Sequence, residues 1–296
     1  MNKTIKIACF GEVLWDVFPD TKRLGGAPLN VAYRLHSFGA EVSMISAIGE
    51  DPLGTETKAA LETLGMDLTN IQTNNLPTGQ VTVTLDAGGS PSYKINENAA
   101  WDAIKATKEA KASVKAADAL IFGSLAFRES ANQLEFEQLL EASSYNVFDL
   151  NLRSPHYELD AVIALMEAAH FIKMNDEELE LITTLMDLSA DDLAGELKEI
   201  AKASNTETVC VTLGAEGAML LHKDKIYTQV GFPTTVADSV GAGDSFLAGL
   251  VFGLLSNETP EDSLEIACAL GSLVASKHGA TAAVSNEEID DLIFES

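Results

Sequence analysis

The sequence predicts an α/β protein built on a mostly parallel β-sheet with crossover helices. Short apolar runs rich in Val, Ile and Phe alternate along the chain with segments of helical periodicity. That alternation is typical of β-α-β units, in which a helix connects two parallel strands. A region near residue 80 has instead the two-residue alternation of a β-hairpin. We therefore expect one large sheet with its helices and one smaller β unit.

The expected elements follow the chain in order. The apolar runs place core strands at residues 5–10, 41–48, 119–122, 146–150, 170–174 and 208–213. The helical periodicity places amphipathic helices at residues 29–38, 53–64, 129–142, 177–186, 193–203 and 260–277, with a further helix at 247–256. Pro28 and Pro260 support two of these starts, because proline is well tolerated in the first turn of a helix.

Two segments stand outside this pattern. Residues 80–85 alternate in polarity, residues 86–91 supply turn chemistry, and residues 93–96 return as a second strand. Residues 13–18 form another short segment with no helix to connect it to the main pattern. From the pattern alone, these pieces fit an ordinary edge hairpin.

Composition excludes several classes of partner. The chain has 296 residues and a formal net charge of −26, so nucleic acid and anionic membranes would be repelled. No apolar stretch is long enough to cross a bilayer, and residue 1 leads directly into a strand rather than a signal peptide. The three cysteines are widely separated and the histidines lack zinc-type spacing. We expect reduced cysteines, no permanent metal and a cytoplasmic location.

The segment Gly241-Ala242-Gly243-Asp244, just before an apolar helix, carries the clearest chemical signal. Glycines let the backbone approach a ligand closely, and the free N–H groups at a helix start favour an anion. A carboxylate beside such an anion site is what phosphoryl transfer to a hydroxyl requires. The alternative is a turn with Asp244 as a helix cap, and this short motif does not decide between them.

The rest of the chain resembles the ribokinase-like (pfkB) carbohydrate kinases. Residues 238–244 are similar to the family signature Asp-Thr-x-Gly-Ala-Gly-Asp, with Ser239 in place of Thr. Further motifs occur in family order at residues 25–32, 49–54, 149–153, 175–178 and 211–217. The resemblance implies a ribokinase-like three-layer sandwich spanning residues 1–296 as a single kinase domain. It also implies a small β-sheet lid formed by segments near 12–24 and 78–101.

The resemblance also implies the roles of particular residues. Asp244 would be the general base, with an ordinary pKa of about 3.9, so that it is ionised at pH 7. The backbone of Gly241, Ala242 and Gly243 would form the anion hole. The sugar would be bound by Asp16, Gly26, Asn30 and Arg153, and ATP by Thr212, Gly214, Gly217 and Gly279.

Metal binding is less determined. By resemblance Asn175 and Glu178 organise Mg²⁺ through water, while from sequence alone the same pair could be a helix capping box. The carbonyls of Asp238 and Val240 correspond to those that hold K⁺ in some relatives. Because carbonyl ligands leave no side-chain signature, K⁺ dependence stays open.

Several functions remain to be distinguished. The run Gly25-Gly26-Ala27-Pro28-x-Asn30 is similar to bacterial fructokinases and 2-keto-3-deoxygluconate kinases. We expect ATP-dependent phosphorylation of D-fructose to fructose 6-phosphate, with 2-keto-3-deoxygluconate kinase or ribokinase as alternatives. A non-catalytic sugar sensor is the alternative from another class. A dinucleotide oxidoreductase is disfavoured because Phe246 replaces the third glycine of its fingerprint, and no P-loop occurs. The sequence leaves open a homodimer formed through the lid.

Overall fold

Two separate β-sheets organise the molecule, whose computed structural model describes residues 3–85 and 91–295. The larger sheet has nine strands in the order β13-β12-β11-β10-β9-β8-β1-β4-β5. All neighbouring strands in it are parallel except the β11–β12 and β12–β13 pairs. The bounds are β1 (Lys6–Phe10), β4 (Glu41–Gly49), β5 (Ile71–Asn74), β8 (Ala119–Gly123), β9 (Asn146–Asp149), β10 (Phe171–Asn175), β11 (Thr208–Thr212), β12 (Ala218–His222) and β13 (Lys225–Gln229).

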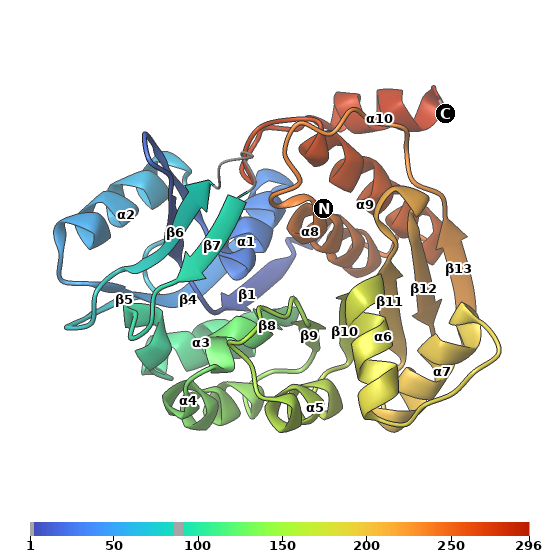
Figure 1. The fold of residues 1–296 in the computed structure, drawn as a ribbon, viewed down its shortest axis with the longest axis horizontal. Coiled ribbons are helices and arrows are strands. Elements are labelled where there is room, and N and C mark those ends of the chain that lie inside the picture. The colour runs from blue at the N-terminus through green and yellow to red at the C-terminus, as the bar shows by residue number, and fades with distance from the viewer. Residues whose placement is uncertain (1–2, 86–90, 296) are drawn as a thin grey trace.

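Helices cover both faces of the large sheet (Figure 1). Because successive strand residues point to opposite faces, Ile7 and Cys9 pack in one core and Ala8 and Phe10 in the other. The first core includes α1 (Ala27–Ser37), α2 (Pro52–Thr63), α8 (Ala242–Leu255), α9 (Pro260–Ala275) and α10 (Asn286–Phe294). The second includes α3 (Lys108–Ala116), α4 (Ser130–Leu140), α5 (Leu159–Glu167), α6 (Asp176–Leu185) and α7 (Leu193–Ala203). The three-layer arrangement expected from the sequence is confirmed.

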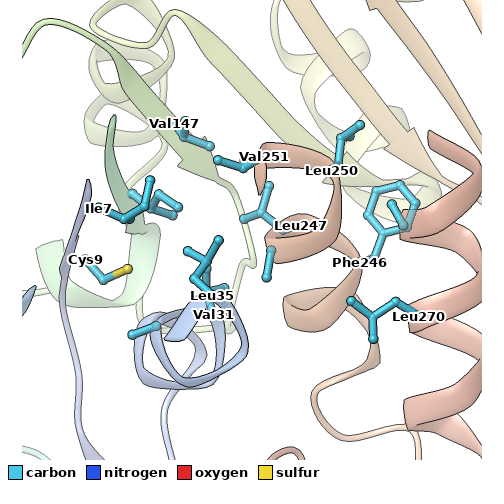
Figure 2. Packing of buried hydrophobic residues seen from close by; sticks show 14 of the residues in the cluster. Ile7, Cys9, Val31, Leu35, Val147, Phe246, Leu247, Leu250, Val251 and Leu270 are labelled. Atoms are coloured by element: carbon cyan, nitrogen blue, oxygen red, sulfur yellow. The ribbon is translucent and has the colours of Figure 1, made fainter. Parts of the chain in front are cut away.

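Most of helix α8, which leads out of the glycine-rich turn, is buried. It is apolar around its circumference, as expected for a helix enclosed by neighbours. Figure 2 shows Phe246 of α8 near Leu270 of α9, and Leu247 on the side of α8 that faces Leu35 of α1. Leu247 and Leu250 are fully buried. This packing fixes the position of the glycine-rich turn at the start of the helix.

The smaller sheet has four strands in the order β3-β2-β6-β7 and lies next to α2 (Figure 1). Its strands are β2 (Leu14–Val17), β3 (Lys22–Gly25), β6 (Gly79–Leu85) and β7 (Pro91–Ile95). The indole Nε1 of Trp15 donates a hydrogen bond to Thr57 Oγ1 of α2 at 2.8 Å, which anchors the sheet. The expected hairpin strands are present as β6 and β7; residues 86–90 of the expected turn lie outside the described residues.

The main departures from expectation are short elements. Helix α8 begins at Ala242 rather than at residue 247, so Gly243 and Asp244 belong to its first turn. The sequence analysis missed α3, α5 and α10, each nine residues long, because so few residues define a helical period poorly. It also missed β5 and the antiparallel β12 and β13 beyond the parallel strands. Among the described residues, none of the helices combines the length and apolar character needed to span a bilayer.

Candidate active site

The carboxyl ends of three parallel strands face the start of α8. Strands β9, β10 and β11 end at Asp149, Asn175 and Thr212, and ligands usually bind at this edge of an open α/β sheet. A Cβ atom placed on Gly243 would lie 3.4 Å from the Nζ atom of Lys173 on β10. The ammonium group of Lys173 therefore lies beside the first turn of α8.

The turn into α8 requires glycine. Gly241 has φ +80°, and a Cβ atom on it would approach the Cβ of Ala280 to 2.4 Å. Gly241 is also the N-cap residue and supplies no side chain to the first turn. Because no side chain caps them, the N–H groups of this turn can bind an anion at the positive end of the helix dipole.

Asp244 projects from this turn and is held by α1. Its Oδ2 atom accepts a hydrogen bond from Asn30 Nδ2 at 2.7 Å. Burial and the charge of Asp149 raise the pKa of Asp244 to about 6, against the opposing effects of Asn30, Lys173 and Arg153. The expectation of an ordinary pKa was wrong, because the sequence does not reveal burial or Asp149. The carboxylate still ionises at neutral pH, and its higher pKa makes it a better proton acceptor.

A buried ion pair adjoins Asp244. Lys173 Nζ donates to Asp149 Oδ1 at 3.0 Å, and both side chains are less than a tenth exposed. Burial alone would lower the pKa of Lys173, but the charges of Asp149 and Glu178 outweigh it and the pKa is raised. The lysine is therefore a permanent cation at the site. Sequence reasoning missed it, although a lone lysine within an apolar strand before Asn-x-x-Glu was a usable signal.

Asn175 and Glu178 form the capping box that the sequence left open. Glu178 N–H donates to Asn175 Oδ1 at 2.8 Å, and Asn175 N–H donates to Glu178 Oε2 at 2.9 Å. The other oxygen, Oε1, accepts from Leu152 N–H at 2.7 Å. Burial raises the pKa of Glu178. The capping role does not exclude a second one, because each carboxylate oxygen has a further lone pair.

In the described part of the chain, no group of three His, Cys, Asp or Glu residues is arranged to hold a metal ion. Oxygen atoms suited to a hydrated ion are nevertheless present. Asp149 Oδ2 is buried without a hydrogen-bond partner, close to Glu178 in the same cluster. This donor set fits Mg²⁺ held through its own water molecules, because Mg²⁺ dehydrates reluctantly.

The small sheet brings Asp16 to the same space. Asp16 lies on β2, and a Cβ atom on Gly25 of the neighbouring β3 would lie 3.0 Å from its Oδ2. Burial raises the pKa of Asp16 to about 6, while Arg153 and Arg23 act in the opposite direction. The exposed Arg153 lowers the pKa of both Asp16 and Asp244. The positive charge of Arg153 therefore acts on both carboxylates.

Glu12 is a further site residue that sequence reasoning missed. It is 2% exposed, its Oε1 accepts from Ala27 N–H at 3.1 Å, and its Oε2 has no partner. Burial raises its pKa to about 7. Glu12 caps α1 because the N-cap residue Gly26 has no side chain. A Cβ atom on Gly26, at φ +114°, would lie 2.4 Å from the Glu12 carbonyl oxygen, so this turn also requires glycine.

A cavity of about 590 Å³ opens beside the start of α8. It is mainly apolar, which suits a planar base, and its volume lies in the usual range for ligand pockets. Its lining includes five of the residues predicted to bind ATP or form the anion hole: Thr212, Gly214, Gly217, Ala242 and Gly243. Gly279 does not line it, but its N–H donates to Asp238 Oδ2 at 3.2 Å. Carbonyl coordination of K⁺ by Asp238 and Val240 stays a prediction.

The groups described above lie near one another at the start of α8. They include a helix start open to an anion, the buried ammonium of Lys173, the Asp244 carboxylate and an apolar cavity. Such a site suits phosphoryl transfer to a hydroxyl group. The model of the pfkB family of carbohydrate kinases matches residues 4–287. The chain belongs to this family, and the resemblance found in its motifs is confirmed.

Individual relatives are more distant. The chain is 27% identical over 306 residues to a fructokinase of Solanum tuberosum, covering 95% of this chain and 93% of the relative. Its fold matches a fructokinase with bound ATP from Xylella fastidiosa at TM-score 0.87 and 22% identity, covering 100% and 99% of the two chains. It matches 2-dehydro-3-deoxygluconokinase from Thermotoga maritima at TM-score 0.88 and 21% identity, covering 99% of each. The ribokinase-like fold is thereby confirmed.

Proposed function

We propose that this carbohydrate kinase transfers the γ-phosphoryl group of ATP to the primary hydroxyl of D-fructose, giving fructose 6-phosphate. The observation that carries the proposal is the position of Asp244, a partly desolvated carboxylate in the first turn of α8 beside Lys173. Fructose is favoured by the fructokinases among the relatives, and the Gly25-Gly26-Ala27-Pro28-x-Asn30 motif is compatible with it.

The chemical step uses the residues in turn. Asp244 accepts the proton of the sugar hydroxyl as its oxygen bonds to the γ-phosphorus and the bond to ADP breaks. A carboxylate with pKa about 6 cannot deprotonate an alcohol beforehand, so the proton moves as the phosphoryl group transfers. Lys173 and the N–H groups of residues 241–244 face the charge on the transferring oxygens. Mg²⁺, when bound, would neutralise phosphate charge, with Glu178 and Asp149 holding its water shell.

The sugar and the nucleotide would bind in different parts of the site, the sugar at the small sheet and the nucleotide in the apolar cavity. Asp16 would accept hydrogen bonds from sugar hydroxyls under the small sheet, which would act as the lid, and Asn30 and Gly26 would contact the same sugar. A carboxylate that accepts from a diol rejects analogues lacking a hydroxyl. The adenine ring would occupy the 590 Å³ cavity, with Thr212, Gly214 and Gly217 in its lining.

A second candidate substrate is 2-keto-3-deoxygluconate. The exposed guanidinium of Arg153 acts on both Asp16 and Asp244, and a guanidinium binds a substrate carboxylate in a fork. A 2-dehydro-3-deoxygluconokinase, which acts on this compound, has a similar fold. Ribose and a sugar sensor without turnover are the remaining outcomes of the test.

The test is ADP release with ATP and Mg²⁺ across fructose, 2-keto-3-deoxygluconate, ribose and tagatose. Asp244→Asn should lower kcat by about 10²–10⁴-fold, the usual contribution of a general base. The matched control is Asp262→Asn, which removes an acidic residue from the first turn of α9 and should leave kcat unchanged. A preference for another sugar would reassign the substrate. Sugar binding without ADP formation would favour the sensor.

A further inference from the structure

One ion pair joins the lid to the loop that leads into α8. Arg23 Nη1 of β3 donates to Asp238 Oδ2 at 2.9 Å, across 215 positions of the sequence. Arginine is scarce in this chain, and Arg23 is the only one of its four arginines on a lid strand. The pair lies outside the chemistry already assigned to Asp244 and Lys173.

The Asp238 carboxylate organises the phosphate side of the site. Besides Arg23, its Oδ2 accepts from Gly279 N–H at 3.2 Å, and its Oδ1 accepts from Val240 N–H at 3.1 Å. The first bond fixes the segment on which Gly241 packs, and the second fixes the turn that precedes Gly241. The carboxylate therefore holds together the two backbone segments that shape the anion hole.

Arg23 belongs equally to the sugar side. It is paired directly with Asp16 across the β2–β3 register, and its guanidinium lies 5.4 Å from the ring centroid of Phe18. The charges of Arg23 and Asp238 both act on the pKa of Asp16, in opposite directions. A movement of β3 that released Asp238 would thus also change the surroundings of Asp16, the residue predicted to bind the sugar.

We propose that Arg23 is a positioning residue that couples closure of the lid over the sugar to formation of the anion hole. This inference rests on the proposed function, in which the sugar lies under the lid and ATP phosphates lie at α8. In this structure Arg23 already contacts Asp238, so a sugar bound under the lid would hold β3 in this position and stabilise the turn at residues 238–241. Each substrate then binds more tightly when the other is present, because both favour the same closed state.

The expected coupling is modest. The Arg23 side chain is 44% exposed and that of Asp238 is 16% exposed, so solvent screens the pair. Ion pairs of this kind change an equilibrium by about twofold to fivefold. Sugar should therefore tighten the binding of a non-hydrolysable ATP analogue by about that factor in the wild-type protein. Calorimetric titration with and without the sugar measures it.

Three variants separate coupling from general damage. Arg23→Met should abolish the tightening and lower kcat/KM for the sugar by about threefold to fivefold. Arg23→Lys keeps a charge that can reach Asp238 and should restore most of the coupling. The control is Lys22→Met on the same strand, whose ammonium pairs instead with Glu56 of α2 at 2.5 Å. It should leave the coupling unchanged.

A double-mutant cycle and hydrogen exchange complete the test. Asp238→Asn combined with Arg23→Met should lower kcat/KM no further than Asp238→Asn alone. In the unliganded protein Arg23→Met should raise amide exchange in residues 14–25 and 236–241 together. Multiplicative effects in the cycle, or exchange that rises in only one segment or in neither, would overturn the inference. The exchange result is independent of the proposed function, which fails separately if the wild-type protein phosphorylates no sugar.

Discussion

Asn30→Ala should move the pH dependence of the reaction rather than only its rate. The amide of Asn30 donates to Asp244 Oδ2 at 2.7 Å and opposes the burial that raises the Asp244 pKa to about 6. A hydrogen bond to a charged group contributes about 1.5–3 kcal/mol, and each pKa unit corresponds to about 1.4 kcal/mol. Losing the bond should therefore raise the pKa by about one to two units.

The sign follows from the role of a base. Asp244 must be deprotonated to accept a proton, so kcat is high above the pKa and falls as pH decreases through it. About nine-tenths of the wild-type carboxylate is ionised at pH 7, given a pKa of about 6. In Asn30→Ala the ionised fraction would be about one-half to one-tenth. The variant should lose about twofold to tenfold in kcat at pH 7 and recover at pH 9.

The assay is kcat from pH 5 to pH 9 at saturating sugar and ATP, with thermal unfolding as a check on folding. Because Asn30 is also predicted to contact the sugar, Asp16→Asn serves as the comparison. It removes a sugar contact without touching the Asn30–Asp244 bond, so it should raise KM and leave the acid limb of kcat in place. If Asn30→Ala instead lowered kcat equally at every pH, the hydrogen bond would not control the base and our reasoning would be wrong.

Two further predictions concern the anion hole and the stability of the fold. Gly241→Ala should lower kcat/KM by about 100-fold or more, because its Cβ would displace the turn. The control is Gly39→Ala, because Gly39 has a similar φ of +88° but open space where its Cβ would lie. Its kcat/KM should stay within about twofold of the wild-type value. Equal losses of kcat/KM in both variants would contradict a role specific to the anion hole. Arg128→Ala should reduce the free energy of unfolding by about 3–5 kcal/mol in urea titrations, because it leaves the buried Asp102 unpaired. A loss below about 1 kcal/mol would show that Asp102 finds another partner.

The sequence alone determined the class of fold and the order of its motifs. Buried parallel strands are continuous apolar runs, and glycine-rich turns use residues adjacent in the chain, so both leave local signals. Residues 241–244 and 175–178 were recognised for this reason. The assignment of Asn175 and Glu178 shows the limit, because one local pattern fits both a capping box and a metal-organising pair.

The tertiary structure decided which charges meet. Lys173 and Asp149 lie on adjacent strands, and Arg23 and Asp238 lie at opposite ends of the chain, so no sequence spacing connects either pair. The raised pKa of Asp244 likewise depends on burial and on Asp149. Desolvation and charge interactions act through space over a few ångströms, whatever the distance along the chain. Local patterns therefore predicted the elements of this kinase, and only the folded arrangement of those elements set the electrostatics of its site.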